Sequence, residues 1–201
     1  ARQNDIRAIV TRGKGDVSAA LIDQCPNLRV ISRCGVGLDN VDVSYATAKG
    51  IKVVNAPGAN ADTVAEHTLA LMLSLQRQVF ATVSAVKAGN WEVRNNYGGD
   101  EIRGKTLGIL GYGNIGRRVE QLALAFGMKV IHGARPEQQG REHNSSETDV
   151  GIPLSDLLRQ SDILTVHLPL TPETKGLLSA QALDQLPPGA LIINTARGEI
   201  M

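Results

Sequence analysis

Short apolar runs alternate along the chain with segments in which apolar residues recur every three or four positions. The short runs are typical of buried strands, and the longer spacing is typical of helices. The predicted strands are 6–10, 28–31, 51–54, 106–110, 129–131, 162–167 and 190–194, and the predicted helices are 18–24, 43–49, 62–87, 114–126, 154–160 and 179–185. This alternation, with short connections, predicts an α/β fold built on parallel sheets.

The longest predicted helix, 62–87, is apolar on nearly all of its faces. A helix with this pattern is normally buried between layers or at an interface. A polar segment, 90–101, follows it and is interpreted as the crossover into a second unit. We therefore predict two doubly wound parallel-sheet units, a first domain over 1–101 and a second over 102–201.

Three glycines follow the predicted strand 106–110 at the spacing G-x-G-x-x-G: Gly111, Gly113 and Gly116. In a βαβ unit, the first glycine allows a tight turn, the second lets a pyrophosphate approach the backbone, and the third lets the helix pack against the strand. The helix N-terminus adds N–H groups and a partial positive charge. The pattern predicts a dinucleotide site, and a glycine-rich turn without a ligand is the alternative.

The ribose of the dinucleotide is expected near position 134, about 20 residues past the glycines. Ala134 has no carboxylate for a ribose 2′-hydroxyl, and Arg135 beside it can accept a 2′-phosphate. This pair favours NADP over NAD as the cofactor. Glu137 lies close by in the sequence and keeps NAD open.

Residues at two further strand ends are candidates for binding anionic ligands. Gly35 and Gly37 flank Val36 after the second predicted strand, where they can form an anion-binding row of N–H groups or merely a tight turn. Arg197 follows the last predicted strand, at the edge where open α/β sheets bind ligands. It can hold a carboxylate through two parallel hydrogen bonds, or pair with an acid on the surface.

The four histidines, at positions 67, 132, 143 and 167, are candidate general acids. His67 lies in the long apolar helix, His143 in a polar loop, and the other two at strand ends. None is followed by an acidic partner at an evident spacing. Structural roles are therefore favoured for all four.

Composition limits the range of partners and sites. The 21 basic and 20 acidic residues nearly balance, which gives no reason to expect a nucleic-acid or membrane partner. Cys25 and Cys34 are too few for a disulfide framework, which fits a reducing compartment and predicts a cytoplasmic protein. No metal site is expected. The sequence begins at Ala1 and ends at Met201 just after a strand, so we expect it to be a piece of a longer protein.

Together these residues resemble the D-isomer-specific 2-hydroxyacid dehydrogenase family, the group containing D-3-phosphoglycerate dehydrogenase and glyoxylate/hydroxypyruvate reductase. The segments that carry the resemblance are 33–42, 55–57, 64–67, 104–116, 167–174 and 194–198. The resemblance implies a flavodoxin-like substrate domain made from both chain ends and a Rossmann domain inserted between them. Both would be partial here, and a homodimer is implied.

The resemblance also implies roles for residues of this sequence. Asn114 and Ile115 would contact the pyrophosphate through their backbone, while Val36 and Gly37 would meet substrate and nicotinamide. Further cofactor-lining residues would be Leu168, Pro169, Thr174, Thr195 and Ala196. Arg197 would be the catalytic arginine that holds the carboxylate of a 2-oxo acid and polarises its carbonyl.

The implied reaction moves a hydride between nicotinamide C4 and substrate C2. The histidine that passes the proton, and the glutamate that keeps it charged, lie beyond the position of Met201 in the family. Arg12 and Arg33 match arginines that hold a substrate phosphate in some phosphoglycerate dehydrogenases, so 3-phosphoglycerate and hydroxypyruvate or glyoxylate all remain candidates. A corepressor-like dinucleotide sensor is the alternative function, and nothing in the sequence favours formate or phosphite oxidation.

Overall fold

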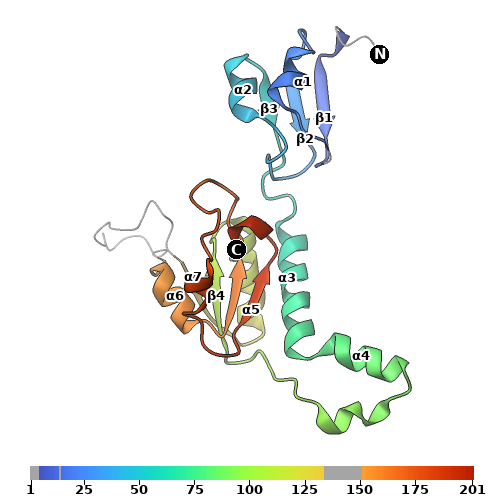
Figure 1. The fold of residues 1–201 in the computed structure, drawn as a ribbon, viewed down its shortest axis with the longest axis vertical. Helices are drawn as coiled ribbons and strands as arrows, with labels where there is room; N and C mark the ends of the chain where they lie inside the picture. The colour runs from blue at the N-terminus through green and yellow to red at the C-terminus, as the bar shows by residue number, and fades with distance from the viewer. Residues whose placement is uncertain (1–4, 14, 134–150) are drawn as a thin grey trace. The chain divides into compact units, whose positions relative to one another are not determined.

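The structure is a computed structural model that describes residues 5–13, 15–133 and 151–201. Contacts divide the chain into two compact units, Ala1–Asn60 and Ala61–Met201, which we call the first and second units. Each contains one parallel sheet with its own helices (Figure 1). The predicted α/β class with two parallel sheets is confirmed.

The first unit is a three-stranded parallel sheet in the order β1-β2-β3. Its elements are β1 (Ala8–Thr11), α1 (Ala19–Asp23), β2 (Val30–Arg33), α2 (Val43–Ala48) and β3 (Lys52–Val54). Thr11 pairs with Arg33 in the register, so β1 and β2 end side by side. The core of this unit consists of Val17, Ile22, Cys25, Leu28, Ile31, Val41, Ala46 and Ile51.

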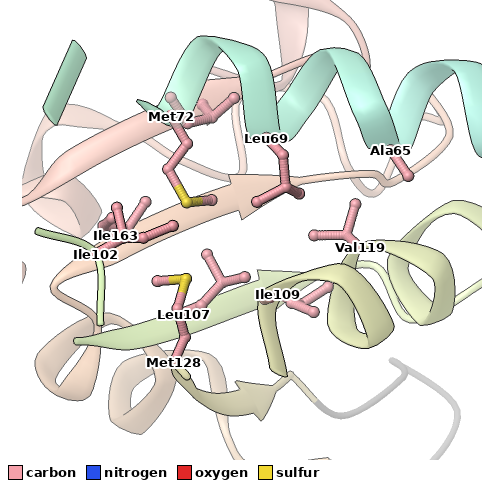
Figure 2. Packing of buried hydrophobic residues seen from close by; sticks show 11 residues of the cluster. Ala65, Leu69, Met72, Ile102, Leu107, Ile109, Val119, Met128 and Ile163 are labelled. Atoms are coloured by element: carbon pink, nitrogen blue, oxygen red, sulfur yellow. The ribbon is translucent and has the colours of Figure 1, made fainter. Parts of the chain in front are cut away.

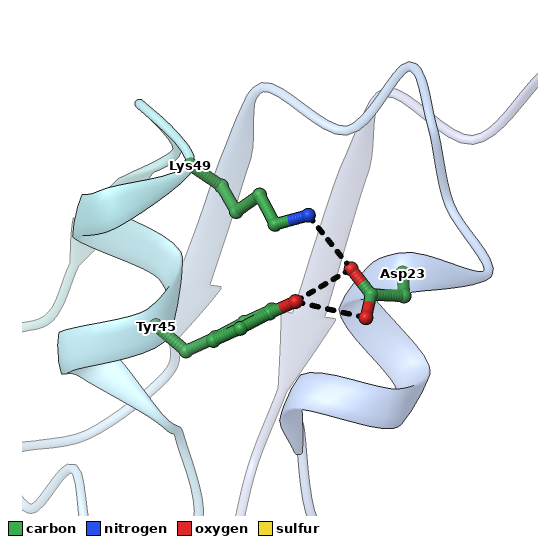
Figure 3. A network of polar contacts seen from close by, with 3 residues as sticks. All are labelled: Asp23, Tyr45 and Lys49. Carbon is green, nitrogen blue, oxygen red and sulfur yellow. Dashed lines mark hydrogen bonds and ion pairs between the residues drawn. The ribbon is translucent and has the colours of Figure 1, made fainter.

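A polar network joins the two helices of the first unit (Figure 3). The Lys49 Nζ lies 3.0 Å from Asp23 Oδ1, and the Tyr45 hydroxyl donates to both Asp23 carboxylate oxygens at 2.8 Å. The hydrogen bond from Lys49, and then that from Tyr45, lower the pKa of Asp23. Asp42 caps the start of α2 by accepting from the Tyr45 N–H at 3.0 Å.

The second unit contains a four-stranded parallel sheet in the order β5-β4-β6-β7. Its elements are α3 (Ala61–Gln76), α4 (Val79–Lys87), the 3₁₀ helix η2 (Trp91–Asn96), β4 (Thr106–Leu110), α5 (Asn114–Ala125), β5 (Lys129–His132), α6 (Leu154–Gln160), β6 (Ile163–Val166), α7 (Ala180–Leu183), β7 (Leu191–Asn194) and η4 (Gly198–Ile200). The strand order reverses at β4, which pairs with β5 on one side and β6 on the other. Open α/β sheets bind ligands at the carboxyl ends of the strands at such a reversal.

Helix α3 packs along α5 and β7, and its buried face closes one side of the second sheet (Figure 2). The residues of α3 that turn inward are Ala65, Thr68, Leu69 and Met72. They meet a core that also contains Ile102, Leu107, Ile109, Val119, Ala123, Met128, Ile163 and Ile193. Burial of these aliphatic side chains holds α3 against the sheet.

The single helix predicted over 62–87 is wrong, because the chain breaks between α3 and α4 (Figure 1). Gln78 adopts a left-handed conformation with φ 48°, and the two helices are bent by 64°. The Tyr97 hydroxyl is hydrogen-bonded beside the break: it donates to the Arg77 carbonyl at 2.8 Å and accepts from Arg77 Nε at 2.9 Å. Apolar periodicity does not reveal this break, because the helical spacing of apolar residues continues through it.

The prediction that this helical segment is buried between layers or at an interface holds for the inward face of α3. No residue of α4 is buried within this chain, so burial of α4 at an interface stays a prediction. His67 lies on α3 but is exposed, so it does not share the burial predicted for this helix. Contacts assign both helices to the second unit, while the predicted domain boundary at 101/102 placed them in the first. Contacts place α3 in the second unit because it packs on α5. The domain boundary at 101/102 stays a prediction.

Among the described residues, no single helix has the length and hydrophobicity to cross a membrane, although the bent α3–α4 pair passes the same criteria of length and composition. Both cysteines are free, with Cys25 buried and Cys34 exposed.

Candidate functional site

The loops that follow β4 and β6 touch each other at the reversal of the strand order. Gly111 has φ 105°, a conformation that favours glycine. A Cβ at this position would lie 2.7 Å from both the carbonyl carbon of His167 and the amide nitrogen of Leu168. Gly111 therefore makes both the tight turn and the close approach of the β6 loop possible.

The other two glycines of the motif differ in their surroundings. A Cβ on Gly116 would overlap the Gly111 carbonyl oxygen, so this glycine lets α5 begin close against β4. A Cβ on Gly113 would meet nothing within 4 Å, and Gly113 is exposed directly before α5. The space over Gly113, at the N-terminus of a 12-residue helix, fits the approach of a pyrophosphate. Asn114 is exposed, and Ile115 packs against the core.

Tyr112, within the glycine turn, forms an aromatic stack with His132. Its ring stacks on the His132 ring with centroids 4.0 Å apart and an interplanar angle of 9°. The Arg117 guanidinium carbon lies 4.7 Å from the Tyr112 ring centroid, and the Tyr112 hydroxyl donates to Glu120. His132 is the last residue of β5, so the stack lies shortly before position 134, near which the ribose is predicted. Sequence reasoning missed it because the stack joins neighbouring strand ends.

The residues that decide the predicted preference for NADP, Ala134 and Arg135, lie outside the described part of the chain, as do Glu137 and His143. Their proposed contact with the ribose stays a prediction.

The loop after β6 is closed by the buried hydroxyl of Thr174. This hydroxyl donates to the Pro169 carbonyl at 2.7 Å and accepts from the Thr171 N–H at 2.8 Å. Pro169 is exposed, while Leu168 packs against a core cluster. Thr174 thus holds the shape of the loop from within, and its predicted contact with the cofactor stays a prediction.

The loop after β7 is shaped by Asn194, the last residue of that strand, for which the sequence predicts no role. Its Oδ1 accepts from the Ala196 N–H at 3.0 Å, and its Nδ2 donates to the Arg197 carbonyl at 2.9 Å. Arg197 is partly buried in an extended conformation, and its Nη1 donates to the Ala196 carbonyl at 2.9 Å. The signal available in the sequence was an amide side chain at the last position of a predicted strand.

In the first unit, Arg12 and Arg33 lie at the carboxyl ends of neighbouring strands. Arg33 is the last residue of β2, and the exposed Arg12 directly follows β1. The Arg33 guanidinium lies over Gly35, where a Cβ would overlap it, and its Nη1 donates to the Cys34 carbonyl at 2.8 Å. The two arginines therefore share one edge of the sheet.

Internal hydrogen bonds limit the anion-binding row expected around Gly35. The Cys34 N–H donates to the Thr11 carbonyl at 2.8 Å, and the Gly35 N–H donates to the Arg33 carbonyl at 2.9 Å. Two carbonyls of this turn also accept hydrogen bonds: that of Gly35 from the Ala56 N–H at 3.0 Å, and that of Val36 from Asn55 Nδ2 at 2.7 Å. The tight-turn alternative accounts for Cys34 and Gly35, and the roles of Val36 and Gly37 stay predictions.

His167 is a partly buried histidine in the loop after β6. Burial lowers its pKa from 6.5 to about 4, so its imidazole is neutral near pH 7. It lies at the carboxyl end of β6, beside the Gly111 turn.

Across residues 5–13, 15–133 and 151–201, no three acidic, histidine or cysteine side chains gather as metal ligands would.

Residues 69–201 match the family described as "D-isomer specific 2-hydroxyacid dehydrogenase, NAD binding domain". The chain is 42% identical over 200 residues to D-3-phosphoglycerate dehydrogenase of Mycobacterium tuberculosis, covering 96% of this chain and 36% of that protein. It is 40% identical over 197 residues to hydroxypyruvate reductase of Thermotoga maritima, covering 96% of this chain and 61% of that protein. The chain thus spans about a third to three fifths of the length of these curated relatives.

Solved structures show the same fold. D-lactate dehydrogenase from Aquifex aeolicus, complexed with NAD and lactic acid, is 31% identical with a TM-score of 0.84, covering 99% of this chain and 59% of that one. An acyclic imino acid reductase in complex with NADPH and D-Arg is 27% identical with a TM-score of 0.85, covering 100% of this chain and 63% of that one.

Proposed function

Because the chain belongs to the D-isomer specific 2-hydroxyacid dehydrogenase family, we propose that the complete protein is an NAD(P)-dependent D-2-hydroxyacid dehydrogenase. The cofactor would supply the hydride, exchanged between nicotinamide C4 and substrate C2. The observation that carries the proposal is the contact of the Gly111 turn with the loop after β6, next to the open space over Gly113. This is the place in an open α/β sheet where a dinucleotide binds.

The chain's own residues are proposed to bind and orient the reactants. The backbone of Gly113, Asn114 and Ile115 would hold the pyrophosphate, and the loops carrying Leu168 and Ala196 would line the rest of the cofactor. Arg197 would hold the substrate carboxylate and polarise the adjacent carbonyl, which favours hydride addition at C2. Proton transfer would use a histidine–glutamate pair that is implied by the family beyond position 201.

The substrate is proposed to be a small 2-hydroxy or 2-oxo acid, with hydroxypyruvate and glyoxylate as singly charged candidates and 3-phosphoglycerate as the candidate that carries a second anionic group. Arg12 and Arg33, at neighbouring strand ends, supply positive charge for such a group. 3-Phosphoglycerate and hydroxypyruvate or glyoxylate are equally supported, since the relatives include both D-3-phosphoglycerate dehydrogenase and hydroxypyruvate reductase.

The proposal is tested by following NAD(P)H oxidation by the complete protein with a panel of 2-oxo acids. Oxidation with phosphohydroxypyruvate, hydroxypyruvate or glyoxylate supports it and ranks the substrates. Tight NAD(P)H binding without oxidation of any panel member would contradict it and favour a dinucleotide sensor.

We expect Gly113→Ala to weaken NAD(P)H binding about tenfold or more without lowering the melting temperature. The added methyl group meets nothing within 4 Å in the protein, and φ at Gly113 is −97°, so the fold should accept it. The methyl group would occupy the space through which the pyrophosphate approaches the backbone. Binding is measured by NAD(P)H fluorescence titration and stability by thermal unfolding. Unchanged affinity in a stable variant would place the pyrophosphate elsewhere.

NADP is proposed as the favoured cofactor, and Ala134→Asp should shift the preference toward NAD. A carboxylate at position 134 would accept from the ribose 2′-hydroxyl and repel a 2′-phosphate. The measurement is the ratio of kcat/KM with NADPH to that with NADH. Ala134→Asn, which adds a similar volume without charge, is the control. An unchanged ratio in the aspartate variant would show that position 134 is not in the ribose pocket.

A homodimer is proposed from the resemblance and is supported by the exposed face of α4. That face carries Val79, Phe80, Val83 and Val86, which are 40 to 68% exposed. Contiguous exposed apolar residues are typical of protein–protein interfaces. Sedimentation of the complete protein as a monomer at micromolar concentration would contradict this.

A further inference from the structure

Three side chains at the carboxyl ends of β6 and β7 form a continuous row with a fourth side chain on α3. The Thr165 hydroxyl lies 3.0 Å from His167 Nε2, and the Thr195 hydroxyl lies 3.4 Å from His167 Nδ1. The Thr195 hydroxyl also lies 3.2 Å from the Thr68 hydroxyl. The row therefore links two strand ends to a helix within the second unit, and Thr68 and Thr165 are completely buried.

The carbonyl at the α3 end of the row fixes the direction of two hydrogen bonds. The Thr68 hydroxyl donates to the Val64 carbonyl at 2.8 Å, because a carbonyl oxygen can only accept. A hydroxyl has one proton, so Thr68 has none left for Thr195. The Thr195 hydroxyl must therefore donate to Thr68, which uses the only proton of Thr195.

The directions of these hydrogen bonds determine which ring nitrogen of His167 carries a proton. With its proton committed to Thr68, the Thr195 hydroxyl can only accept from His167, so Nδ1 carries a proton. In a neutral imidazole the other ring nitrogen is then unprotonated and accepts from the Thr165 hydroxyl. Burial of His167 favours the neutral imidazole over the charged one.

We propose that His167 is a positioning residue that, as the neutral Nδ1–H tautomer, ties the segment carrying Leu168 and Pro169 to the segment carrying Thr195, Ala196 and Arg197. Its functional meaning rests on the proposed function, in which these two segments line the cofactor. The row anchors both segments to α3 through Thr68. A consequence is that the Thr195 hydroxyl has no proton to donate to a bound dinucleotide.

The tautomer is measured without cofactor by long-range ¹H–¹⁵N NMR of the complete protein labelled at histidine. The signals of His167 are assigned by their loss in His167→Gln. We expect a protonated Nδ1 and an unprotonated Nε2. A protonated Nε2 in the wild-type protein would overturn the proposed row.

The variant pair Thr68→Val and Thr68→Ser tests the link to α3. Valine has nearly the same shape as threonine and lacks the hydroxyl, so the Thr195 hydroxyl can turn to donate to His167 Nδ1. We expect Thr68→Val to move His167 toward the Nε2–H tautomer and to weaken NAD(P)H binding about fivefold, the effect of losing one hydrogen bond. Thr68→Ser keeps the hydroxyl and should match the wild type in both measurements.

The results for Thr68→Val and Thr68→Ser separate a role of Thr68 in setting the His167 tautomer from a role of the row in cofactor binding. An unchanged tautomer in Thr68→Val would show that Thr68 does not direct the row. A changed tautomer with unchanged NAD(P)H affinity would show that the row does not position the cofactor loops. If Thr68→Val does not fold, the wild-type tautomer still tests the assignment. Failure of the wild type to bind any NAD(P)H would contradict the proposed function while leaving the tautomer assignment standing.

Discussion

Replacement of Arg197 by alanine in the complete protein should lower kcat/KM by about 100-fold or more, because two charge-assisted hydrogen bonds to the substrate carboxylate are lost. The loop that presents Arg197 is held by Asn194, which bonds both to the Ala196 N–H and to the Arg197 carbonyl. The backbone at Arg197 is extended, with φ −141° and ψ 139°, so alanine fits without strain. The loss should therefore report on the guanidinium rather than on the fold.

Arg197→Lys is the matched variant, since it keeps the positive charge but not the planar fork of donors. We expect it to recover only part of the activity. The NAD(P)H dissociation constant, measured without substrate, should change little in either variant because the guanidinium is proposed to contact the substrate. Turnover near the wild-type value in Arg197→Ala would contradict the catalytic role proposed for Arg197.

Lowering the pH from about 6.5 to about 4 should cost the second unit roughly 3 kcal/mol of unfolding free energy through His167 alone. Burial places the pKa of His167 at about 4 in the folded state, against 6.5 when it is exposed. Between these values the unfolded chain binds a proton that the folded chain does not. The unfolding free energy therefore rises with pH across this window, and the contribution of His167 is flat above and below it.

The measurement is urea unfolding at a series of pH values, followed by the fluorescence of Trp91, the only tryptophan of the chain. In His167→Asn the slope between pH 4 and 6.5 should largely disappear, because an amide does not titrate. Asp23, Asp42 and Asp100 have pKa values lowered from 3.8, so their contributions are lost mainly below this window. The pKa of Glu173 is lowered from 4.5, so its contribution begins to be lost near the acid end of the window in both proteins and cancels in the comparison. Equal slopes in the wild type and His167→Asn would show that His167 is solvated in the folded state.

The glycine turn and its flanking elements could be predicted almost to the residue. The apolar run of β4, the three glycines and the helical spacing of α5 are contiguous in the sequence, and the structure has β4 as Thr106–Leu110 and α5 as Asn114–Ala125. The ends of the other strands lie within two residues of the predictions. Each of these features is local, because neighbouring residues alone supply the pattern and the turn.

Features that join distant segments could not be predicted in this way. At the break between α3 and α4, hydrogen bonds join Arg77 to Tyr97, which is 20 residues away in the sequence. Helical periodicity continues through Gln78 and carries no trace of that contact. The burial of α3 and the exposure of α4 likewise follow from which helix meets α5.

The amino-acid sequence by itself determined the family, the order of strands and helices, and the residues that make a pyrophosphate-binding turn possible, since these are contiguous patterns. Tertiary structure decided which strand ends become neighbours: the order β5-β4-β6-β7 brings the Gly111 turn against His167 and Leu168. It also joined Thr68 to Thr195, which are 127 residues apart. The tautomer of His167 follows from that contact, because the proton of each hydroxyl goes where the packed fold places an acceptor.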